Sequence, residues 1–471
     1  MAHAQWGVFV QSLDSGQVLY SRNAGKLLMP ASNVKILTLA AAAHTLGWDA
    51  RFPTTLESAG TIHAGTLLGD LIVRGGGDPT INSRDGRANA VFAEWIRALR
   101  LHGITEIRGR IVGDDTAFED VPLGTGWAWD DLQYWYSAPI GALQLNDSVV
   151  EMSVIPGPAV GDPAVIRIDP HGGLQVWNRT RTSAPGIPPT LDFHRHLDRP
   201  LLEVTGTVPL PVKAAAASQA GLARQVAVVN PTLHFVESLR DALVAAGIRV
   251  TGDAVDLDDI AAERGRQPER RVLARTESPP LREMAVVLMK VSHNLYAETL
   301  FKASGAAAHG SATSELGRRA VLDALREWKL ETHPVIVADG SGLSRYNYAS
   351  PALLAGVLRQ MYLDPAHRDR FVAALPIAGK DGTVSARMRG TRAEANATAK
   401  TGSLSSVRAL SGYLRTASGE MLVFSILGNN FAIPGATVNW IADLAVEVLA
   451  NFRGDLPGSP TENPAQPRAR H

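Results

Sequence analysis

The pattern of apolar and polar positions predicts mixed helices and strands at both ends of the chain and a strand-rich middle. Short apolar runs at 6–10 and 17–20 flank an Asp-Ser-Gly turn at 14–16, which is typical of a β-hairpin. The run at 34–46 is apolar and alanine-rich, so we expect a buried helix of about 3–4 turns there. Between 149 and 273, glycine and proline separate short apolar segments, which favours short strands.

After residue 279 the apolar residues return to helical spacing, and a group of strands follows near the C-terminus. The expected strands lie at 397–404, 407–416 and 419–430 and form an antiparallel meander. The expected helices of the whole chain lie at 34–46, 88–102, 232–246, 281–291, 295–307, 310–330, 350–362 and 434–451. We expect the N-terminal hairpin to complete the meander as one sheet. The two ends would then form one domain, and the middle would be an insertion.

Composition excludes several classes of protein. The 471 residues are 45% hydrophobic and 20% charged, which is ordinary for a soluble globular protein of two or three domains. Lysine and arginine total 46, as do aspartate and glutamate, so the net charge of zero gives no indication of nucleic-acid or anionic-membrane binding. Without cysteine, a disulfide framework, a thiol nucleophile and thiolate metal sites are excluded.

The start of the printed sequence lacks the charged and apolar regions of a secretory signal, and no apolar run reaches the length of a membrane span. Two interpretations remain open from sequence form alone. The protein is cytoplasmic, or an export signal has been removed ahead of residue 1.

The chemically most suggestive stretch is the beginning of the predicted helix at 34–46, where Ser32 and Lys35 lie three residues apart. A lysine at the N-terminus of a buried helix is disfavoured by the helix dipole and by burial, and both lower its pKa. A neutral amine beside a serine hydroxyl can activate it as a nucleophile. A capping serine followed by a lysine that extends to solvent fits the same four residues, so other motifs must decide.

Two further polar motifs lie in apolar surroundings. Ser292-His-Asn294 is at a predicted helix–helix junction, and Lys400-Thr-Gly ends a predicted strand at a sheet edge. A similar Lys-x-Gly-Thr sequence begins at Lys380, but no β-forming run leads into it, so we assign the third motif to Lys400. The three motifs in this order are the pattern of penicilloyl serine transferases.

The chain resembles the low-molecular-mass, class C penicillin-binding proteins of the D-alanyl-D-alanine carboxypeptidase/endopeptidase type, the DacB-like group of peptidase family S13. The resemblance extends to about residue 451 and includes GGGDP at 75–79, LNDS at 145–148, SHNLYAE at 292–298 and DGSGLSR at 339–345. The third motif reads KTGS, with Ser403 where threonine is usual, and this substitution keeps a hydroxyl.

The resemblance implies an α+β fold. A penicillin-binding, β-lactamase-like transpeptidase domain, with an antiparallel sheet flanked by helices, would be interrupted by a two-domain insertion. The expected ranges are 1–53 and 274–453 for the peptidase domain, 54–91 and 146–273 for a β-rich domain II, 92–145 for a small αβ domain III, and 454–471 for a disordered tail.

The family's chemistry, carried onto the matching residues, implies a serine DD-peptidase. Ser32 would attack the carbonyl between two D-alanines and Lys35 would accept its proton. Ser292, held by Lys35 and Lys400, would relay a proton to the leaving amine. Asn294 would hydrogen-bond the substrate amide, and no metal or other cofactor is needed.

The remainder of the KTGS strand would bind the substrate's terminal carboxylate. Lys400, Thr401 and Ser403 would supply positive charge and hydroxyls. The backbone N–H groups of Ser32 and Ser403 would form an oxyanion hole. Gly402, having no side chain, would let the substrate lie against the strand as an added β-segment.

Two loops carry further candidate substrate contacts. Ser341 and Arg345 belong to the DGSGLSR loop. The aromatic stretch at 124–138 contributes Asp130 with Trp127, Trp129 and Tyr136, although such a stretch is as often the packing edge of a small domain.

The expected partners are peptidoglycan stem peptides and β-lactam antibiotics, with no nucleic acid. By analogy with an exported family, the expected location is extracytoplasmic, in the periplasm or on the cell-wall side. Two alternatives stay open: a β-lactamase with the same motifs, and an inactive penicillin-binding module that binds cell wall. The long insertion and the lack of an obvious extra base near Ser292 disfavour the first. The intact motifs disfavour the second.

Overall fold

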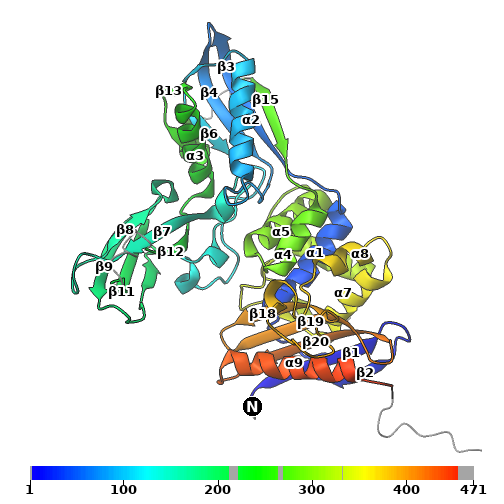
Figure 1. The fold of residues 1–471 in the computed structure, drawn as a ribbon. Helices are drawn as coiled ribbons and strands as arrows, with labels where there is room; N and C mark the ends of the chain where they lie inside the picture. The colour runs from blue at the N-terminus through cyan, green and yellow to red at the C-terminus, as the bar shows by residue number, and fades with distance from the viewer. Residues whose placement is uncertain (1–2, 212–220, 264–268, 331–332, 455–471) are drawn as a thin grey trace, which may run out of the picture.

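The structure, a computed structural model, describes residues 3–211, 221–263, 269–330 and 333–454 (Figure 1). A body of helices and one sheet contains both ends of the described chain, and two inserted units project from it (Figure 1). The tail predicted to be disordered lies, from residue 455 onward, outside the described residues.

One five-stranded antiparallel sheet organises the body, in the order β18-β19-β20-β1-β2. Its strands are β1 (Gln5–Ser12), β2 (Val18–Arg22), β18 (Thr398–Leu404), β19 (Val407–Arg415) and β20 (Met421–Asn429). Strand β1 pairs with β20 from Gln5 opposite Asn429 to Ser12 opposite Leu422. The N-terminal hairpin therefore completes the C-terminal meander, which confirms that prediction.

Side chains alternate between the two faces of this sheet, and helices cover both faces. In β19, Ala409 and Tyr413 pack with the larger helical layer, whereas Leu410 and Leu414 pack with α9 (Gly435–Asn451). The larger layer contains α1 (Val34–Leu46), α4 (Leu281–Lys290), α5 (Asn294–His309), α6 (Ser314–Glu327), α7 (Pro351–Leu363) and α8 (Arg368–Ala374) (Figure 1). Because both faces are covered, β19 and β20 are buried along almost their whole length.

One inserted unit is built on a mixed sheet of seven strands, ordered β13-β5-β4-β3-β15, with β6 pairing both β4 and β14. Its elements are β3 (Pro53–His63), β4 (Thr66–Gly75), α2 (Arg87–Leu101), β5 (Glu106–Arg108), β6 (Ile111–Asp114), α3 (Pro231–Ala245), β13 (Arg249–Val250), β14 (Ala254–Asp256) and β15 (Arg270–Glu277). The apolar sides of both helices pack in one core with this sheet, through Trp95 of α2 and Phe235 of α3.

The second inserted unit consists of two three-stranded sheets, ordered β12-β7-β8 and β10-β11-β9. Its strands are β7 (Val149–Ile155), β8 (Val165–Ile168), β9 (Gln175–Ser183), β10 (Asp192–Arg195), β11 (Leu201–Pro209) and β12 (Leu222–Ala227). Alternate residues of these strands, such as Met152, Val154, Leu202 and Val204, form a small separate core.

The strand pairing groups the insertion differently from the predicted ranges. Residues 92–145 were expected to form their own αβ domain, but β5 and β6 from this range pair in parallel with β4. Helix α2 is the crossover from β4 to β5, and β15, which begins at the end of the 146–273 range, closes the other edge of the sheet. Apolar periodicity predicts individual strands but not their partners, so the predicted division placed one sheet in three ranges.

The local predictions differ from the structure in two places. The apolar alternation at 104–112 predicts a single strand, but this stretch is divided into β5 and β6, which pair with separate parts of β4. Glycines and other turn formers predict loop from 363 to 396, but this stretch contains α8, which is seven residues long and buries Phe371 and Ala374 in the core of the body. So short a helix gives almost no periodic signal.

Candidate active site

The Ser32–Lys35 pair lies where the chain enters the central helix of the body. Ser32 is in a 3-10 turn (Ala31–Asn33) immediately before α1, rather than in its first α-helical turn. Ala31 adopts a left-handed conformation, with φ of 46°. Lys35 is completely buried, and its Nζ lies 3.0 Å from Ser32 Oγ. The turn and the helix together thus place the amine within hydrogen-bond distance of the hydroxyl.

Lys35 has two other polar neighbours. Its Nζ lies 2.6 Å from Asn294 Oδ1 and 2.6 Å from the carbonyl oxygen of Ser341. Burial lowers the pKa of Lys35 from 10.5 to about 7, while the charges of Asp339 and Glu298 oppose that shift. A substantial fraction of Lys35 is therefore neutral near pH 7 and able to accept the Ser32 proton.

Ser292 and Lys400 form a second pair. Ser292 is at the corner between α4 and α5, in a left-handed conformation with φ of 62°, and its Oγ accepts a hydrogen bond of 2.8 Å from Lys400 Nζ. Lys400 is fully buried on β18, and burial, with a smaller effect of the Lys35 charge, lowers its pKa well below 10.5. Lys380, the rejected alternative, is exposed and pairs with Glu394 at 3.1 Å.

Asn294 connects the Lys35 pair to the aromatic segment of the insertion. Its Oδ1 is bonded to Lys35, and its Nδ2 donates to the carbonyl oxygen of Tyr136 at 2.6 Å. The resemblance implied that Lys35 also holds Ser292. Instead, Lys35 Nζ is hydrogen-bonded to Ser32, Asn294 and Ser341, and Ser292 is held by Lys400.

These groups open onto a pocket of about 370 Å³ at the edge of the body. Its lining includes Ser32, Ser292, Asn294, Thr401, Gly402 and Ser403, with Asp131, Trp135, Tyr136, Val291, Gly342, Leu343, Thr383, Leu404 and Ser405. Gly402 is also small for a local reason, because a Cβ there would lie 2.7 Å from the carbonyl oxygen of Pro30. Because Gly402 has no Cβ, β18 can approach the turn that carries Ser32.

The predicted contacts in the two loops are divided between the pocket and its surroundings. Tyr136 lines the pocket. Ser341 is buried, with its hydroxyl 3.3 Å from Asp339 and its carbonyl on Lys35, so it contacts the site through the main chain. Arg345 is exposed at the rim and donates to the carbonyl oxygen of Ser405 at 3.1 Å.

Asp130, Trp127 and Trp129 do not line the pocket. Asp130 is exposed, Trp127 Nε1 donates to Asp339 at 2.9 Å, and the Trp129 ring packs edge-on against His194 at a centroid distance of 5.4 Å. The structure therefore supports the packing role left open for this stretch at Trp127 and Trp129. A 3-10 turn (Trp129–Asp131) rotates successive side chains in different directions, which the sequence did not reveal.

Asp131 and Thr383 line the pocket but are not among the predicted substrate contacts. Asp131 accepts a 2.8 Å hydrogen bond from the Tyr136 hydroxyl. Thr383 belongs to the rejected Lys380 motif, and its hydroxyl accepts from Thr401 Oγ1 at 2.7 Å. No local pattern marks either residue, because each depends on how a loop packs against the cleft.

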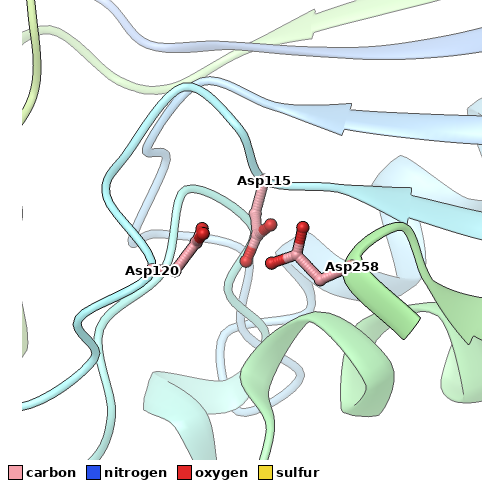
Figure 2. Close-up of side chains that lie close together, drawn as sticks. All are labelled: Asp115, Asp120 and Asp258. Carbon is pink, nitrogen blue, oxygen red and sulfur yellow. The ribbon is translucent and has the colours of Figure 1, made fainter. Parts of the chain in front are cut away.

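Within the described residues, one group of carboxylates is close enough to share a cation. This group is Asp115, Asp120 and Asp258, in the first inserted unit and away from the pocket. One carboxylate oxygen of each lies within 4.8 Å of those of the other two (Figure 2). Burial and the charges of Asp256 and Asp258 raise the pKa of Asp115 to about 6. Protonation of Asp115 thus relieves part of the repulsion.

None of the helices in the described part of the chain combines the length and hydropathy that a membrane span requires.

The whole chain is similar to known peptidases. It is 34% identical over 460 residues to the D-alanyl-D-alanine carboxypeptidase of Actinomadura sp. (strain R39), covering 95% of this chain and 81% of that protein. It is 29% identical over 433 residues to D-alanyl-D-alanine carboxypeptidase DacB of Haemophilus influenzae, covering 90% of this chain and 85% of that protein.

The structural comparison agrees. The crystal structure of penicillin binding protein 4 (dacB) from Haemophilus influenzae superposes with a TM-score of 0.82 at 26% identity, covering 96% of this chain and 98% of that one. The same protein complexed with a novel β-lactam gives a TM-score of 0.76 at 25% identity, covering 95% of this chain and 97% of that one.

The fold and the three motifs define a protein of the penicillin-binding class, which confirms the predicted α+β fold class and resemblance. More particularly, the model of the D-Ala-D-Ala carboxypeptidase 3 (S13) family matches residues 1–451, and the chain belongs to this family of serine peptidases.

Proposed function

We propose that the protein hydrolyses the D-Ala-D-Ala bond of peptidoglycan stem peptides through an acyl-enzyme on Ser32. The observation that carries this proposal is the Lys35 amine, 3.0 Å from Ser32 Oγ and with its pKa lowered to about 7. Membership of a D-Ala-D-Ala carboxypeptidase family supports the choice of substrate.

The residues would divide acylation into two proton transfers. Neutral Lys35 accepts the Ser32 proton while Oγ bonds to the carbonyl carbon between the two D-alanines. The backbone N–H groups of Ser32 and Ser403 bind the oxyanion. As the C–N bond breaks, Ser292 donates its proton to the leaving amine, with Lys400 at 2.8 Å stabilising the Ser292 oxygen. Water then hydrolyses the ester: it gives one proton to the Ser292 oxygen, its hydroxide bonds to the carbonyl carbon, and Lys35 returns its proton to Ser32 Oγ as the ester bond breaks.

The carboxylate of the terminal D-Ala would bind beside Lys400, Thr401 and Ser403 on β18. Thr401 and Ser403 line the pocket, and Lys400 is buried beside them on the same strand. Asn294 uses its oxygen on Lys35 and one N–H on Tyr136, so its second N–H is the group left for the substrate amide.

The same site would be acylated by β-lactams, consistent with the β-lactam complex of the structurally similar Haemophilus influenzae protein. Since peptidoglycan lies outside the cytoplasm, we assign the enzyme an extracytoplasmic location, in the periplasm or on the cell-wall side. Neither the neutral net charge nor the site suggests a nucleic-acid partner.

The test is the intact mass of the protein after incubation with benzylpenicillin. We expect a persistent adduct that maps to Ser32 and disappears in Ser32→Ala, together with loss of D-Ala release from a stem pentapeptide. Ser405→Ala is the matched control, because Ser405 lines the same pocket but lies outside the three motifs, and its adduct should persist.

Each alternative gives a different result in this experiment. An adduct that vanishes within seconds with drug turnover would identify a β-lactamase. Folded protein that forms no adduct and turns over no drug would identify a binding module. D-Ala release by Ser32→Ala would refute the assignment of the nucleophile.

A further inference from the structure

A second pocket, of about 510 Å³, adjoins the active-site pocket beside Ser292. The two pockets share Trp135 and Val291 as walls. Val291 and His293 flank Ser292 in the chain, and His293 lines the second pocket. The corner that carries Ser292 therefore separates the two pockets.

The inserted units provide one side of this second pocket. Val149 of β7 and Gln225 of β12 line it, and so do Val287 on α4 and Val291, the residue just after α4. Val287 and Val291 lie one turn apart and are 39% and 52% exposed. They therefore present an apolar surface that a ligand would cover.

Charged groups of both signs surround this apolar surface. Arg84 pairs with Asp147 on one side, and its side chain remains 61% exposed. Asp85 is exposed at the same rim. His293 is buried with Nε2 3.4 Å from Asp147 Oδ1, and its Nδ1 has no hydrogen-bond partner among the residues that the structure describes. Such a lining matches a peptide with ionised groups rather than a purely apolar ligand.

The position of the pocket indicates which part of a substrate it would hold. In the proposed reaction, Ser292 protonates the leaving amine, so whatever that amine carries lies on the Ser292 side of the scissile bond. A single D-alanine is too small to occupy a further 510 Å³. A cross-linked substrate instead has an entire second stem peptide attached to this amine.

We propose that the pocket between α4 and the inserted units binds the leaving stem peptide of a cross-linked substrate. This inference rests on the proposed function, because it uses the same acylation. The amide C–N bond of the cross-link breaks, the Ser32 Oγ–C bond forms, and the amine leaves with the proton donated by Ser292. Water then releases the acyl half. The inserted units thereby contribute to the choice between linear and cross-linked substrates.

The experiment compares two substrates in variants that fill the pocket. The parent and Val287→Trp are assayed on a linear stem pentapeptide and on a dimer of two stem peptides joined by a D-Ala–diamino acid cross-link. We expect Val287→Trp to lower kcat/KM for the dimer at least tenfold, while kcat/KM for the linear peptide changes less than twofold. Gln225→Trp fills the pocket from the opposite wall and should have the same effect.

Val286→Trp is the matched control. Val286 neighbours Val287 on α4 and is similarly exposed, at 37%, but does not line the pocket, so this variant should cleave both substrates like the parent. Acylation by benzylpenicillin confirms that each variant is folded.

The outcomes separate the two proposals. Unchanged dimer cleavage in both filled variants, or an equal loss on both substrates, overturns the subsite assignment. A parent that releases D-Ala from the linear peptide but leaves the dimer intact overturns the subsite alone. A parent that cleaves neither substrate overturns the proposed function and the subsite with it.

Discussion

At the scale of single residues, burial decides the protonation of the lysines. Lys35 and Lys400 are both fully buried, and each contacts a serine hydroxyl. Burial disfavours the charged form of each lysine. At Lys35 the nearby carboxylates Asp339 and Glu298 partly offset this, because their charges favour the protonated amine. A pKa of about 7 is suited to a base that must accept and later return a proton near neutral pH.

We therefore expect acylation by benzylpenicillin to increase with pH through about 7. The neutral amine of Lys35 is the active form, so below this value the second-order acylation rate should fall about tenfold per pH unit. Stopped-flow acylation rates between pH 5 and 9 measure this. Lys35→Ala should lower the acylation rate by about 10²–10⁴-fold, and its rate should no longer rise with pH through about 7. A parent rate independent of pH across this range would contradict the role of Lys35.

At the scale of elements, α5 connects the nucleophile's base to the DGSGLSR loop. Asn294 and Glu298 lie one turn apart on α5, and Glu298 accepts hydrogen bonds from the backbone N–H groups of Gly340 at 3.0 Å and Ser341 at 2.7 Å. These bonds fix the Ser341 carbonyl that contacts Lys35. Burial and the charge of Asp339 raise the pKa of Glu298 to about 7.

Glu298→Gln should weaken this connection. The amide offers one acceptor oxygen, so one of the two buried N–H groups faces an NH₂ group instead, at a cost of about 1–3 kcal/mol in the free energy of unfolding. Urea denaturation measures the loss, and the acylation rate should also fall as the Ser341 carbonyl shifts.

Glu94→Gln, on the exposed side of α2, is the control and should change stability by no more than about 0.5 kcal/mol. Equal stability of Glu298→Gln and Glu94→Gln would show that the loop does not depend on Glu298.

At the scale of the whole molecule, the two ends of the chain hold the nucleophile between them. Asn429 at the end of β20 accepts from the backbone N–H of Met29 at 2.7 Å and donates to its carbonyl at 3.1 Å. Asn33 donates to the carbonyl of Lys400 at 3.1 Å. These contacts join residues 400 and 367 positions apart and fix the Ser32 turn against β20 and β18, while the insertion projects from the body (Figure 1).

Asn429→Ala should therefore destabilise the body. Removing this buried side chain leaves the N–H and carbonyl of Met29 without these partners, at about 1–3 kcal/mol for each group that stays unsatisfied. The thermal unfolding midpoint and urea denaturation measure the effect. Asn89→Ala, on the exposed side of α2, removes an amide of the same size and should leave stability within about 0.5 kcal/mol. A midpoint for Asn429→Ala equal to that of Asn89→Ala would contradict this role.

The sequence by itself determined the local elements and the chemistry they carry. Ser32 and Lys35 are three residues apart at a helix start, so their contact follows from local geometry. The helices at 34–46 and 281–291 and the C-terminal meander follow from apolar periodicity, because these segments bury one or both faces whatever they pack against.

Only the tertiary structure decided which distant groups meet. The contacts of Lys35 with Asn294, and of Lys400 with Ser292, span 259 and 108 residues and depend on how the whole body packs. The same holds for Asp131 rather than Asp130 in the pocket, for one sheet drawn from three predicted ranges, and for the pocket beside Val287. A periodic pattern specifies which face of an element is buried, whereas packing of the complete chain specifies its partner.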